Sequence, residues 1–288
     1  MKHNNKKGKV VIVAGGSGGI GSEIHRQLTI LGAQTIVVSR NSSHSTKSQN
    51  EIARMSSNSI FLNKDLRLFE EWDELIETVL MKFERIDILI NSVGIIIPGA
   101  FTNLTKSEIE NYLNTNMLSI IYGARAVAPV MKKQKYGHII NIGSLGGIVP
   151  MPYETMYCAT KFGIRGFSLS LAEELKKSGI NVSLISPGTV KTKLLDLEAT
   201  DDKSTISFVN KPYDPKTIAK VTLKLIQNPQ SEVIIPSYIK QPSLIAGKNA
   251  KLFAGIYPLL NAIGRKGLKH YRKKYLNHLI INGKISLK

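Results

Sequence analysis

Tyr157 and Lys161 stand four positions apart in the stretch "YCATK" and could together do acid–base chemistry. The pattern of residues 154–177 predicts a helix, so both side chains project from one face. A free tyrosine has a pKa of about 10, which is too high for easy proton exchange at neutral pH. A nearby ammonium favours the phenolate and lowers that pKa, which would make Tyr157 a usable acid or base. Chance pairs at this spacing are common in helices, so the pair alone carries little weight.

Cys158, between them, is the only cysteine of the chain. One step along a helix turns a side chain by about 100°, away from the face of Tyr157. Free cysteine is commonly a small buried hydrophobe, and we expect Cys158 to pack. A single cysteine cannot form an intramolecular disulfide, and the 6 histidines show no spacing typical of a zinc site, so we expect no metal.

A glycine-rich run, "AGGSGGIG" (14–21), follows a short apolar stretch and precedes a helical pattern. Gly15, Gly19 and Gly21, spaced G-x-x-x-G-x-G, permit a tight turn and a close approach of the backbone to a pyrophosphate. The N-terminus of the following helix would offer free N–H groups to that anion. Glycines also collect in ordinary turns, but those turns need neither a preceding strand nor a following helix. Because both are expected here, the run predicts a dinucleotide site.

The segment "VVSRN" (37–41) ends the second expected strand, where NAD-preferring sites usually place an acid. Here Ser39 and Arg40 stand instead, and no acid occurs until Glu51. A guanidinium suits the 2′-phosphate of NADP(H), so we expect this cofactor and favour NAD(H) less. The alternative is that Arg40 is a solvated loop residue and cofactor specificity is relaxed.

The elements that must position these residues alternate along the chain. Nearly all-apolar runs predict buried strands at 9–14, 34–39, 59–63, 86–91, 137–143, 180–186 and 232–236. Helical patterns lie between them, for example at 70–83 and 108–133. We therefore expect an α/β fold, a Rossmann-type doubly wound and mostly parallel seven-stranded sheet with helices on both faces. Residues 40–50 are expected to form a loop leading into a helix, and the long segment 192–214 a lid or binding loop.

Six motifs in order resemble the short-chain dehydrogenase/reductase family over residues 8 to about 237: "AGGSGGIG", "NSVG" (91–94), "NTNMLS" (114–119), "NIGSLGG" (141–147), "YCATK" and "SPGTVKT" (186–192). The resemblance implies that Tyr157 is the catalytic acid/base and that Ser144 hydrogen-bonds the substrate oxygen. It implies that Lys161 binds the nicotinamide ribose and tunes Tyr157, and that Asn116 holds a water that relays protons. The family's usual Thr is Ala14 here and its N-N-A-G is "NSVG", but neither change touches these four residues.

The resemblance also implies a set of cofactor contacts along the predicted strand ends. They are Gly15, Ser17, Gly18, Gly19, Ile20, Gly21, Ser39, Arg40, Asp65, Leu66, Asn91, Tyr157, Lys161, Pro187, Gly188, Val190 and Thr192. Together these residues imply an NADPH-dependent carbonyl reductase or alcohol dehydrogenase, and the family implies a homo-dimer or homo-tetramer. Residues 95–99, 145–153 and 189–212 are expected to shape an apolar pocket for a hydrophobic, lipid-like carbonyl or alcohol. The alternative is a non-catalytic dinucleotide-sensing or scaffold protein on the same fold.

The net charge of +18 is concentrated at one end of the chain. Residues 233–288 hold 11 Lys or Arg and no acid, which leaves 18 − 11 = +7 for the rest. We expect a catalytic domain at 1–240 and a basic helical extension at 241–288, with one apolar stripe at 252–263 interrupted by Pro258. The extension is too short and charged to span a bilayer.

Three alternatives remain for this extension. Contact with an anionic membrane surface is favoured. Packing against the same or another subunit comes next, and nucleic-acid binding is least favoured because no binding module is recognisable. The apolar run near the N-terminus is too short for a secretory signal, so we expect a cytoplasmic protein, with or without association with a membrane surface.

Overall fold

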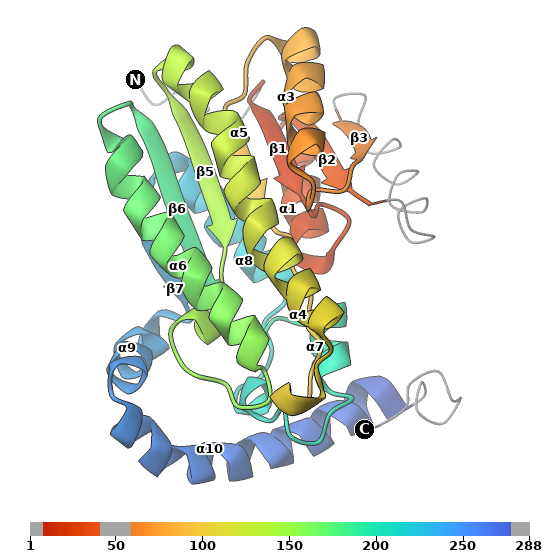
Figure 1. Cartoon of the computed structure of the whole chain (residues 1–288), viewed down its shortest axis with the longest axis vertical. Helices are drawn as coiled ribbons and strands as arrows, with labels where there is room; N and C mark the ends of the chain where they lie inside the picture. The colour runs from red at the N-terminus through yellow and green to blue at the C-terminus, as the bar shows by residue number, and fades with distance from the viewer. Residues whose placement is uncertain (1–7, 41–58, 278–288) are drawn as a thin grey trace.

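Parallel strands form the centre of the computed structural model, which describes residues 8–40 and 59–277 (Figure 1). In this part of the chain seven strands pair in the order β3-β2-β1-β4-β5-β6-β7, and every pairing is parallel. The strands are β1 (Val10–Ala14), β2 (Gln34–Ser39), β3 (Ser59–Asn63), β4 (Ile88–Asn91), β5 (Gly137–Ile142), β6 (Ile180–Pro187) and β7 (Glu232–Ile235). The predicted fold class is confirmed, and each predicted strand agrees with an observed one to within two residues.

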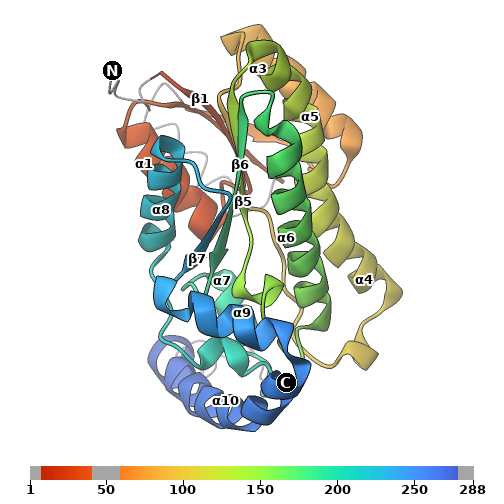
Figure 2. The ribbon, with the colours of Figure 1, turned by 90° about the vertical axis from the view of Figure 1, so that its left-hand side faces the viewer.

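Helices cover both faces of this sheet, as Figure 2 shows from the side. One face carries α1 (Gly19–Ile30) and α8 (Pro215–Gln227), and the other carries α3 (Phe69–Phe83), α5 (Ser119–Gln134) and α6 (Thr155–Lys176). Alternate residues of β1 enter the two hydrophobic cores, Ile12 on the α3 side and Val11 on the α1 side. Because both faces of the strands are buried, only the strand ends are open for a ligand.

The helix expected at 108–133 is interrupted, so that prediction is wrong in one respect. The structure has α4 (Lys106–Leu113), a π-helical turn η2 (Asn114–Leu118) and then α5. The side chain of Asn116, in the π turn, is fully buried and bonds the backbone of Ile95 just beyond β4. A π turn inserts one extra residue into a helix, which helical periodicity does not reveal, and such turns are frequent at functional sites. The helix expected to follow the loop at 40–50 lies outside the described residues.

After β7 the chain forms α9 (Lys240–Lys248), the long helix α10 (Ala250–Tyr271) and a π turn, η6 (Arg272–Leu276). Pro258 lies inside α10 and does not end it. In Figures 1 and 2 this extension crosses below the carboxyl ends of the strands. Among the described residues no helix is long and apolar enough to cross a membrane.

The last part of α10 packs against its own chain, on α7 (Lys193–Glu198) and η4 (Ile206–Phe208). Their shared buried cluster consists of Leu195, Ala199, Phe208, Leu268, Tyr271 and Leu276. The Tyr271 hydroxyl donates to Asp196 at 2.8 Å, and Arg272 donates to the Ala199 carbonyl at 2.6 Å. Packing against the same subunit, one of the alternatives for the extension, is therefore present.

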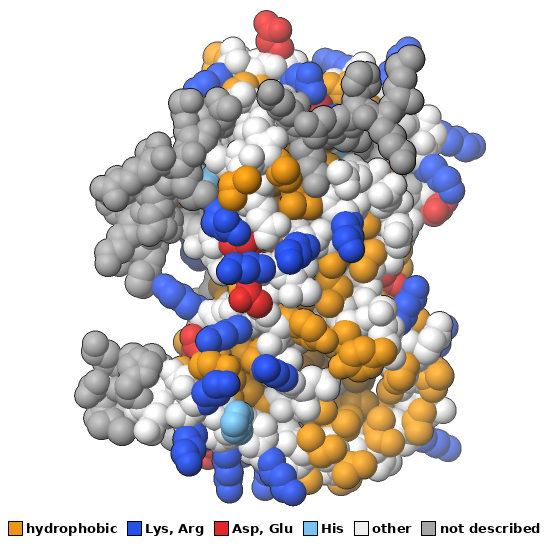
Figure 3. All heavy atoms as spheres, turned by 180° about the vertical axis from the view of Figure 1, so that it is seen from behind, with side chains coloured by type: hydrophobic (Ala, Val, Ile, Leu, Met, Phe, Trp, Pro, Cys, Tyr) orange, Lys and Arg blue, Asp and Glu red, His pale blue; other side chains and the backbone are white. Residues whose placement is uncertain are grey.

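Some apolar side chains of the extension remain exposed. They are Tyr238, Ile245, Leu252, Leu259 and Ile263. Figure 3 shows apolar side chains gathered at the bottom of the molecule, where α9 and α10 lie, with Lys and Arg side chains beside them. The apolar stripe expected at 252–263 is thus divided between a buried and an exposed side.

We predict that the close approach of α10 to the chain beneath it depends on two glycines. A Cβ atom at Gly267 would lie 1.9 Å from the Phe208 carbonyl oxygen, and one at Gly264 would lie 2.2 Å from the Thr205 carbonyl oxygen. Gly267→Ala should therefore destabilise the protein by about 1–3 kcal/mol, because backbone must shift. Gly255→Ala, in the same helix, meets nothing within 4 Å and should stabilise it by about 0.5–1 kcal/mol. Equal denaturant midpoints for the two variants would contradict this packing.

Candidate active site

A cavity of about 760 Å³ lies at the carboxyl ends of the strands and runs from the glycine loop to α10. Most of the residues predicted from the sequence line it: Gly15, Ser17, Gly18, Gly19, Ile20, Ser39, Arg40, Asp65, Leu66, Ser144, Tyr157, Lys161, Pro187, Gly188, Val190 and Thr192. Three predicted residues, Gly21, Asn91 and Asn116, do not line this cavity. One continuous space therefore joins the expected cofactor residues to the expected catalytic residues.

The glycine loop has the geometry of an anion cradle. Gly15 has φ +76°, and a Cβ atom there would lie 2.7 Å from the Ser92 carbonyl oxygen. Helix α1 begins at Gly19, and the preceding Gly18 has no side chain to cap its first N–H groups. A Cβ atom at Gly21 would lie 2.4 Å from the Gly15 carbonyl oxygen, so Gly21 packs the helix against the loop instead of facing the cavity. The backbone of this loop is thus left open to a negatively charged group.

The far end of the cavity is basic. Arg67 makes a fork of hydrogen bonds to Asp65, which lowers the pKa of that carboxyl, and Lys64 pairs with Glu71 at 2.8 Å. Arg40 is exposed and has no ion pair within residues 8–40 and 59–277. The Ser39 hydroxyl oxygen beside it is buried and finds no hydrogen-bond partner in the same part of the chain. An unpaired cation next to an unsatisfied hydroxyl suits an anionic ligand group.

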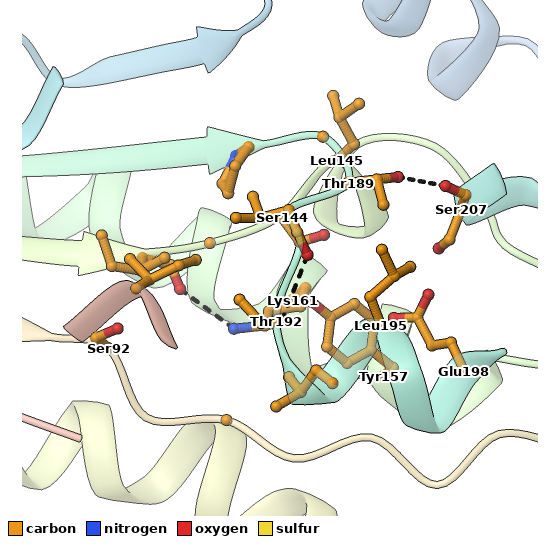
Figure 4. A pocket seen from close by; sticks show the side chains of 18 of the residues that line it. Ser92, Ser144, Leu145, Tyr157, Lys161, Thr189, Thr192, Leu195, Glu198 and Ser207 are labelled. Atoms are coloured by element: carbon orange, nitrogen blue, oxygen red, sulfur yellow. Dashed lines mark hydrogen bonds between the residues drawn. The ribbon is translucent and has the colours of Figure 1, made fainter. Parts of the chain in front are cut away.

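Ser144, Tyr157 and Lys161 meet at the other end (Figure 4). Ser144 follows β5, where its hydroxyl oxygen accepts from the Gly146 N–H at 3.0 Å and where it hydrogen-bonds Tyr157. Tyr157 and Lys161 are one turn apart on α6, as predicted. The Lys161 ammonium donates to the Ile142 carbonyl at 3.2 Å and lies 5.6 Å from the centre of the Tyr157 ring. The strand end and the helix together place a hydroxyl, a phenol and an ammonium around one point.

The pKa of Tyr157 differs from the sequence-based expectation. Burial raises this pKa above its ordinary value, the hydrogen bond with Ser144 acts in the opposite direction, and the carboxyls of Glu198 and Glu154 raise it further. Lys161 was expected to lower it. In this arrangement the ammonium is itself buried, which lowers the pKa of Lys161 to about 8, and it contacts the Ile142 carbonyl instead of the phenol. Tyr157 is therefore held in its neutral, proton-carrying form.

Two buried asparagines support the site from outside the cavity. The Asn116 amide accepts from the Ile95 N–H at 2.8 Å and donates to the Ile95 carbonyl at 3.0 Å, so it fixes the loop after β4. Asn91 donates to Asn141 at 2.9 Å and joins β4 to β5. The side-chain amide of Asn116 is thus committed to protein groups, and its role in holding a water stays a prediction, as does cofactor contact by Asn91.

Cys158 is buried, and burial raises the pKa of its thiol to about 12, which makes the thiolate scarce. This environment is that of a packed thiol, as expected from the sequence. In the part of the chain that the structure describes, no group of three or more His, Cys, Asp or Glu is placed to hold a metal ion.

The substrate half of the cavity is mostly apolar. The predicted segments 95–99, 145–153 and 189–212 supply part of its wall, including Ile95, Leu145, Val149, Leu195 and Val209. The chain after β7 also lines the cavity, which the sequence did not predict, through Ile239, Pro242, Ser243, Ala246, Phe253, Ile256 and Leu260. The spacing of the last three by three and four residues was a signal for one helical face, but nothing in the pattern said which surface that face would meet.

Glu198 is a second omission, because it lines the cavity next to Tyr157 and belongs to no motif (Figure 4). Glu154, just before α6, is also buried nearby. In the stretch "LLDLEAT" (194–200) Glu198 is one of two acids, and nothing in the pattern distinguishes it from an ordinary exposed helix residue. No sequence signal could therefore have identified it.

Comparison with known proteins places the chain among relatives of this fold. Residues 9–203 match the family described as short chain dehydrogenase. The chain is 35% identical over 246 residues to an uncharacterised oxidoreductase of Staphylococcus saprophyticus, covering 83% of this chain and 98% of that relative. It is 30% identical over 228 residues to the ketoacyl reductase HetN of Nostoc, covering 79% of this chain and 78% of that relative.

Solved structures are similar as well. A metagenomic short-chain oxidoreductase in complex with NADP has a TM-score of 0.68 at 29% identity, over 80% of this chain and 98% of that one. A short-chain dehydrogenase/reductase of Burkholderia phymatum in complex with NAD has a TM-score of 0.78 at 18% identity, over 86% and 96%, and supports the fold alone. The glycine loop, the Ser144, Tyr157 and Lys161 cluster and the match over residues 9–203 agree: the chain belongs to the short-chain dehydrogenase family of oxidoreductases.

Proposed function

We propose that this protein is an NADPH-dependent carbonyl reductase, or alcohol dehydrogenase in the reverse direction, for hydrophobic, lipid-like substrates. One observation carries the proposal: Ser144, Tyr157 and Lys161 line the same cavity as the glycine loop. The relative named as a ketoacyl reductase supports a carbonyl on an acyl chain as the reacting group. The apolar wall built by Leu145, Val149 and the extension supports a hydrophobic substrate.

The cofactor residues fit a phosphorylated dinucleotide. The open backbone of the glycine loop and the N-terminus of α1 would hold the pyrophosphate, and Lys161 would hold the nicotinamide ribose. Arg40 and the unsatisfied Ser39 hydroxyl would hold the 2′-phosphate of NADP(H). When bound, this group supplies the hydride that reduces the carbonyl carbon. Similar structures hold NADP in one case and NAD in another, so the preference rests on Arg40 and Ser39.

The side chains around the substrate oxygen would then do the proton chemistry. Ser144 would donate a hydrogen bond to the carbonyl oxygen and stabilise the negative charge that develops there. Tyr157 would give its proton to the same oxygen. Burial raises the pKa of Tyr157 and keeps the phenol protonated, so the proton that it would donate is present at neutral pH.

We predict that Tyr157→Phe abolishes most of the turnover. Losing the proton donor should lower kcat by about 10²- to 10⁴-fold for any carbonyl that the wild type reduces. Cys158→Ala, at the next position of the same helix, should keep most of the wild-type activity because the thiol only packs. Cofactor oxidation is followed at 340 nm with aliphatic, steroid-like and acyl carbonyls. Survival of turnover in Tyr157→Phe would contradict the mechanism, and NADPH binding without turnover in the wild type would favour the dinucleotide-sensing or scaffold alternative.

Arg40 should set the cofactor preference. Arg40→Ala removes a charged donor to the 2′-phosphate, a contact of about 1.5–3 kcal/mol, so kcat/KM for NADPH should fall by about 10- to 100-fold. NADH lacks the 2′-phosphate and serves as the internal control, since its kcat/KM should change little. A parallel loss with both cofactors would show that Arg40 does not read the 2′-phosphate.

We also propose that the extension touches an anionic lipid surface. Leu252, Leu259 and Ile263 are exposed on α10, and exposed basic residues lie near them: Lys248, Lys251, Arg265, Lys266 and Lys269. Apolar side chains would enter the interface while the cations meet acidic headgroups. A lipid surface at this place would lie beside the helix that walls the substrate cavity. A homo-dimer or homo-tetramer stays a prediction from the family resemblance.

Sedimentation with vesicles tests this contact. Truncation of the extension would also remove the wall of the cavity, so point variants are better suited. The wild type should sediment with phosphatidylcholine–phosphatidylserine vesicles and less with phosphatidylcholine alone, and Leu259→Glu combined with Ile263→Glu should reduce sedimentation. Met81→Glu, at an exposed apolar position on α3 outside the extension, is the control. Equal sedimentation of all three proteins would exclude the extension as the membrane contact.

A further inference from the structure

Two carboxyl groups are buried beside Tyr157. Glu154 precedes α6 and is 1% exposed, and Glu198 ends α7 and is 8% exposed. The Ser207 hydroxyl donates to Glu154 at 3.5 Å and also hydrogen-bonds Glu198. One hydroxyl proton cannot satisfy two carboxyls, so Ser207 leaves acceptor capacity on the pair unfilled.

No cation compensates these carboxyls. Within the described residues neither glutamate forms an ion pair with Lys or Arg. The titratable groups that face them are neutral or acidic: Tyr157 and Cys158 on α6, Tyr112 on α4, Asp201 after α7 and Tyr271 on α10. Burial raises the pKa of Glu198 to about 7, and burial with repulsion from Glu198 raises the pKa of Glu154. Each carboxyl therefore favours its protonated form more than a free carboxyl does.

Glu198 faces the cavity. It lines the cavity, whereas Glu154 does not, and Figure 4 shows its carboxyl close to the Tyr157 ring. Its Oε2 atom is buried and has no hydrogen-bond partner among the described residues. Much of the nearby wall is apolar, with Leu195, Ile206 and Val209. A buried polar atom without a partner costs free energy, so a ligand that supplies a partner is bound preferentially.

We propose that Glu198 hydrogen-bonds a hydroxyl group of the substrate, separate from the carbonyl that Ser144 and Tyr157 bind. The inference rests on the proposed function and narrows its substrate class to hydrophobic carbonyl compounds that carry a hydroxyl. A hydroxyl both donates and accepts, so it can pair with this carboxyl in either of its protonation states. A cationic substrate is disfavoured by the net charge of +18, and an anionic one by the carboxyl pair itself.

Substrate pairs that differ in one hydroxyl test this assignment. With NADPH, kcat/KM is measured for 2-alkanones and for the same ketones bearing a hydroxyl at successive chain positions. The wild type should prefer the hydroxylated member of at least one pair by about 10-fold or more, because a ketone without it leaves the buried carboxyl unpaired. Glu198→Leu should remove that preference because it has no carboxyl to pair with the hydroxyl, and the readout is the ratio of the two kcat/KM values within a pair.

Two further variants separate recognition from general damage to the cavity. Glu198→Gln keeps a donor and an acceptor but cannot ionise. The wild-type preference should rise from pH 6 to pH 8, because the carboxyl loses its proton in this range and becomes the stronger acceptor, and the preference of Glu198→Gln should stay flat. Val209→Ala, on the apolar wall, should change kcat/KM for both members of a pair by the same factor.

Calorimetric titration of the NADP⁺-loaded Tyr157→Phe protein with the same ketones measures recognition without turnover. If a hydroxylated ketone binds more tightly than the plain ketone, and the difference is lost in Tyr157→Phe/Glu198→Leu, the assignment is supported. This holds even if the wild type reduces no ketone, a result that would overturn only the proposed reductase function. If the wild type reduces both ketones of a pair and Glu198→Leu leaves the ratio of their kcat/KM values unchanged, the assignment is overturned. The proposed reductase function is not affected by that result. A preference for amino-substituted over hydroxylated ketones would overturn the hydroxyl class.

Discussion

Burial of the parallel sheet on both faces is the constraint on which the rest of the structure depends. Most strand residues are apolar and contribute to a hydrophobic core on each face, so α1 and α8 must cover one face while α3, α5 and α6 cover the other. What remains open is the edge where the strands end. The glycine loop after β1, Ser144 after β5 and residues 187–192 after β6 all emerge there. The predicted cofactor and catalytic residues, far apart in the chain, thus converge because packing leaves only this edge open.

The C-terminal extension changes the character of this open edge. By packing through Leu268 and Tyr271 on the segment after β6, α10 covers the substrate side of the cavity and adds Phe253, Ile256 and Leu260 to its wall. An enclosed apolar space penalises charge. Burial in the site raises the pKa values of Tyr157 and Glu198 and lowers that of Lys161. The packing of α10 thus shapes the volume of the cavity that these buried groups line.

Local patterns predicted much of this arrangement. The strands could be predicted because burial of both faces makes their sequences mostly apolar. The glycine loop could be predicted because the φ of +76° at Gly15 and the close contact at Gly21 favour glycine. The π turn at Asn116 escaped prediction because it depends on a hydrogen bond to Ile95, 21 residues away. The pKa of Tyr157 was expected to be lowered, but burial raises it. Helical spacing shows that Lys161 is near Tyr157 and does not show how deeply either group is buried.

The sequence by itself determined the sheet, the cofactor loop and the identity of Ser144, Tyr157 and Lys161, because each depends on residues close together in the chain or on a periodic pattern. Only the tertiary structure decided which side of α10 faces the cavity, how the basic extension divides between packed and exposed surfaces, and that Glu154 and Glu198 share a buried site through Ser207. Those features arise between segments that are distant in the chain. Their energies come from desolvation and contact, which no local pattern records.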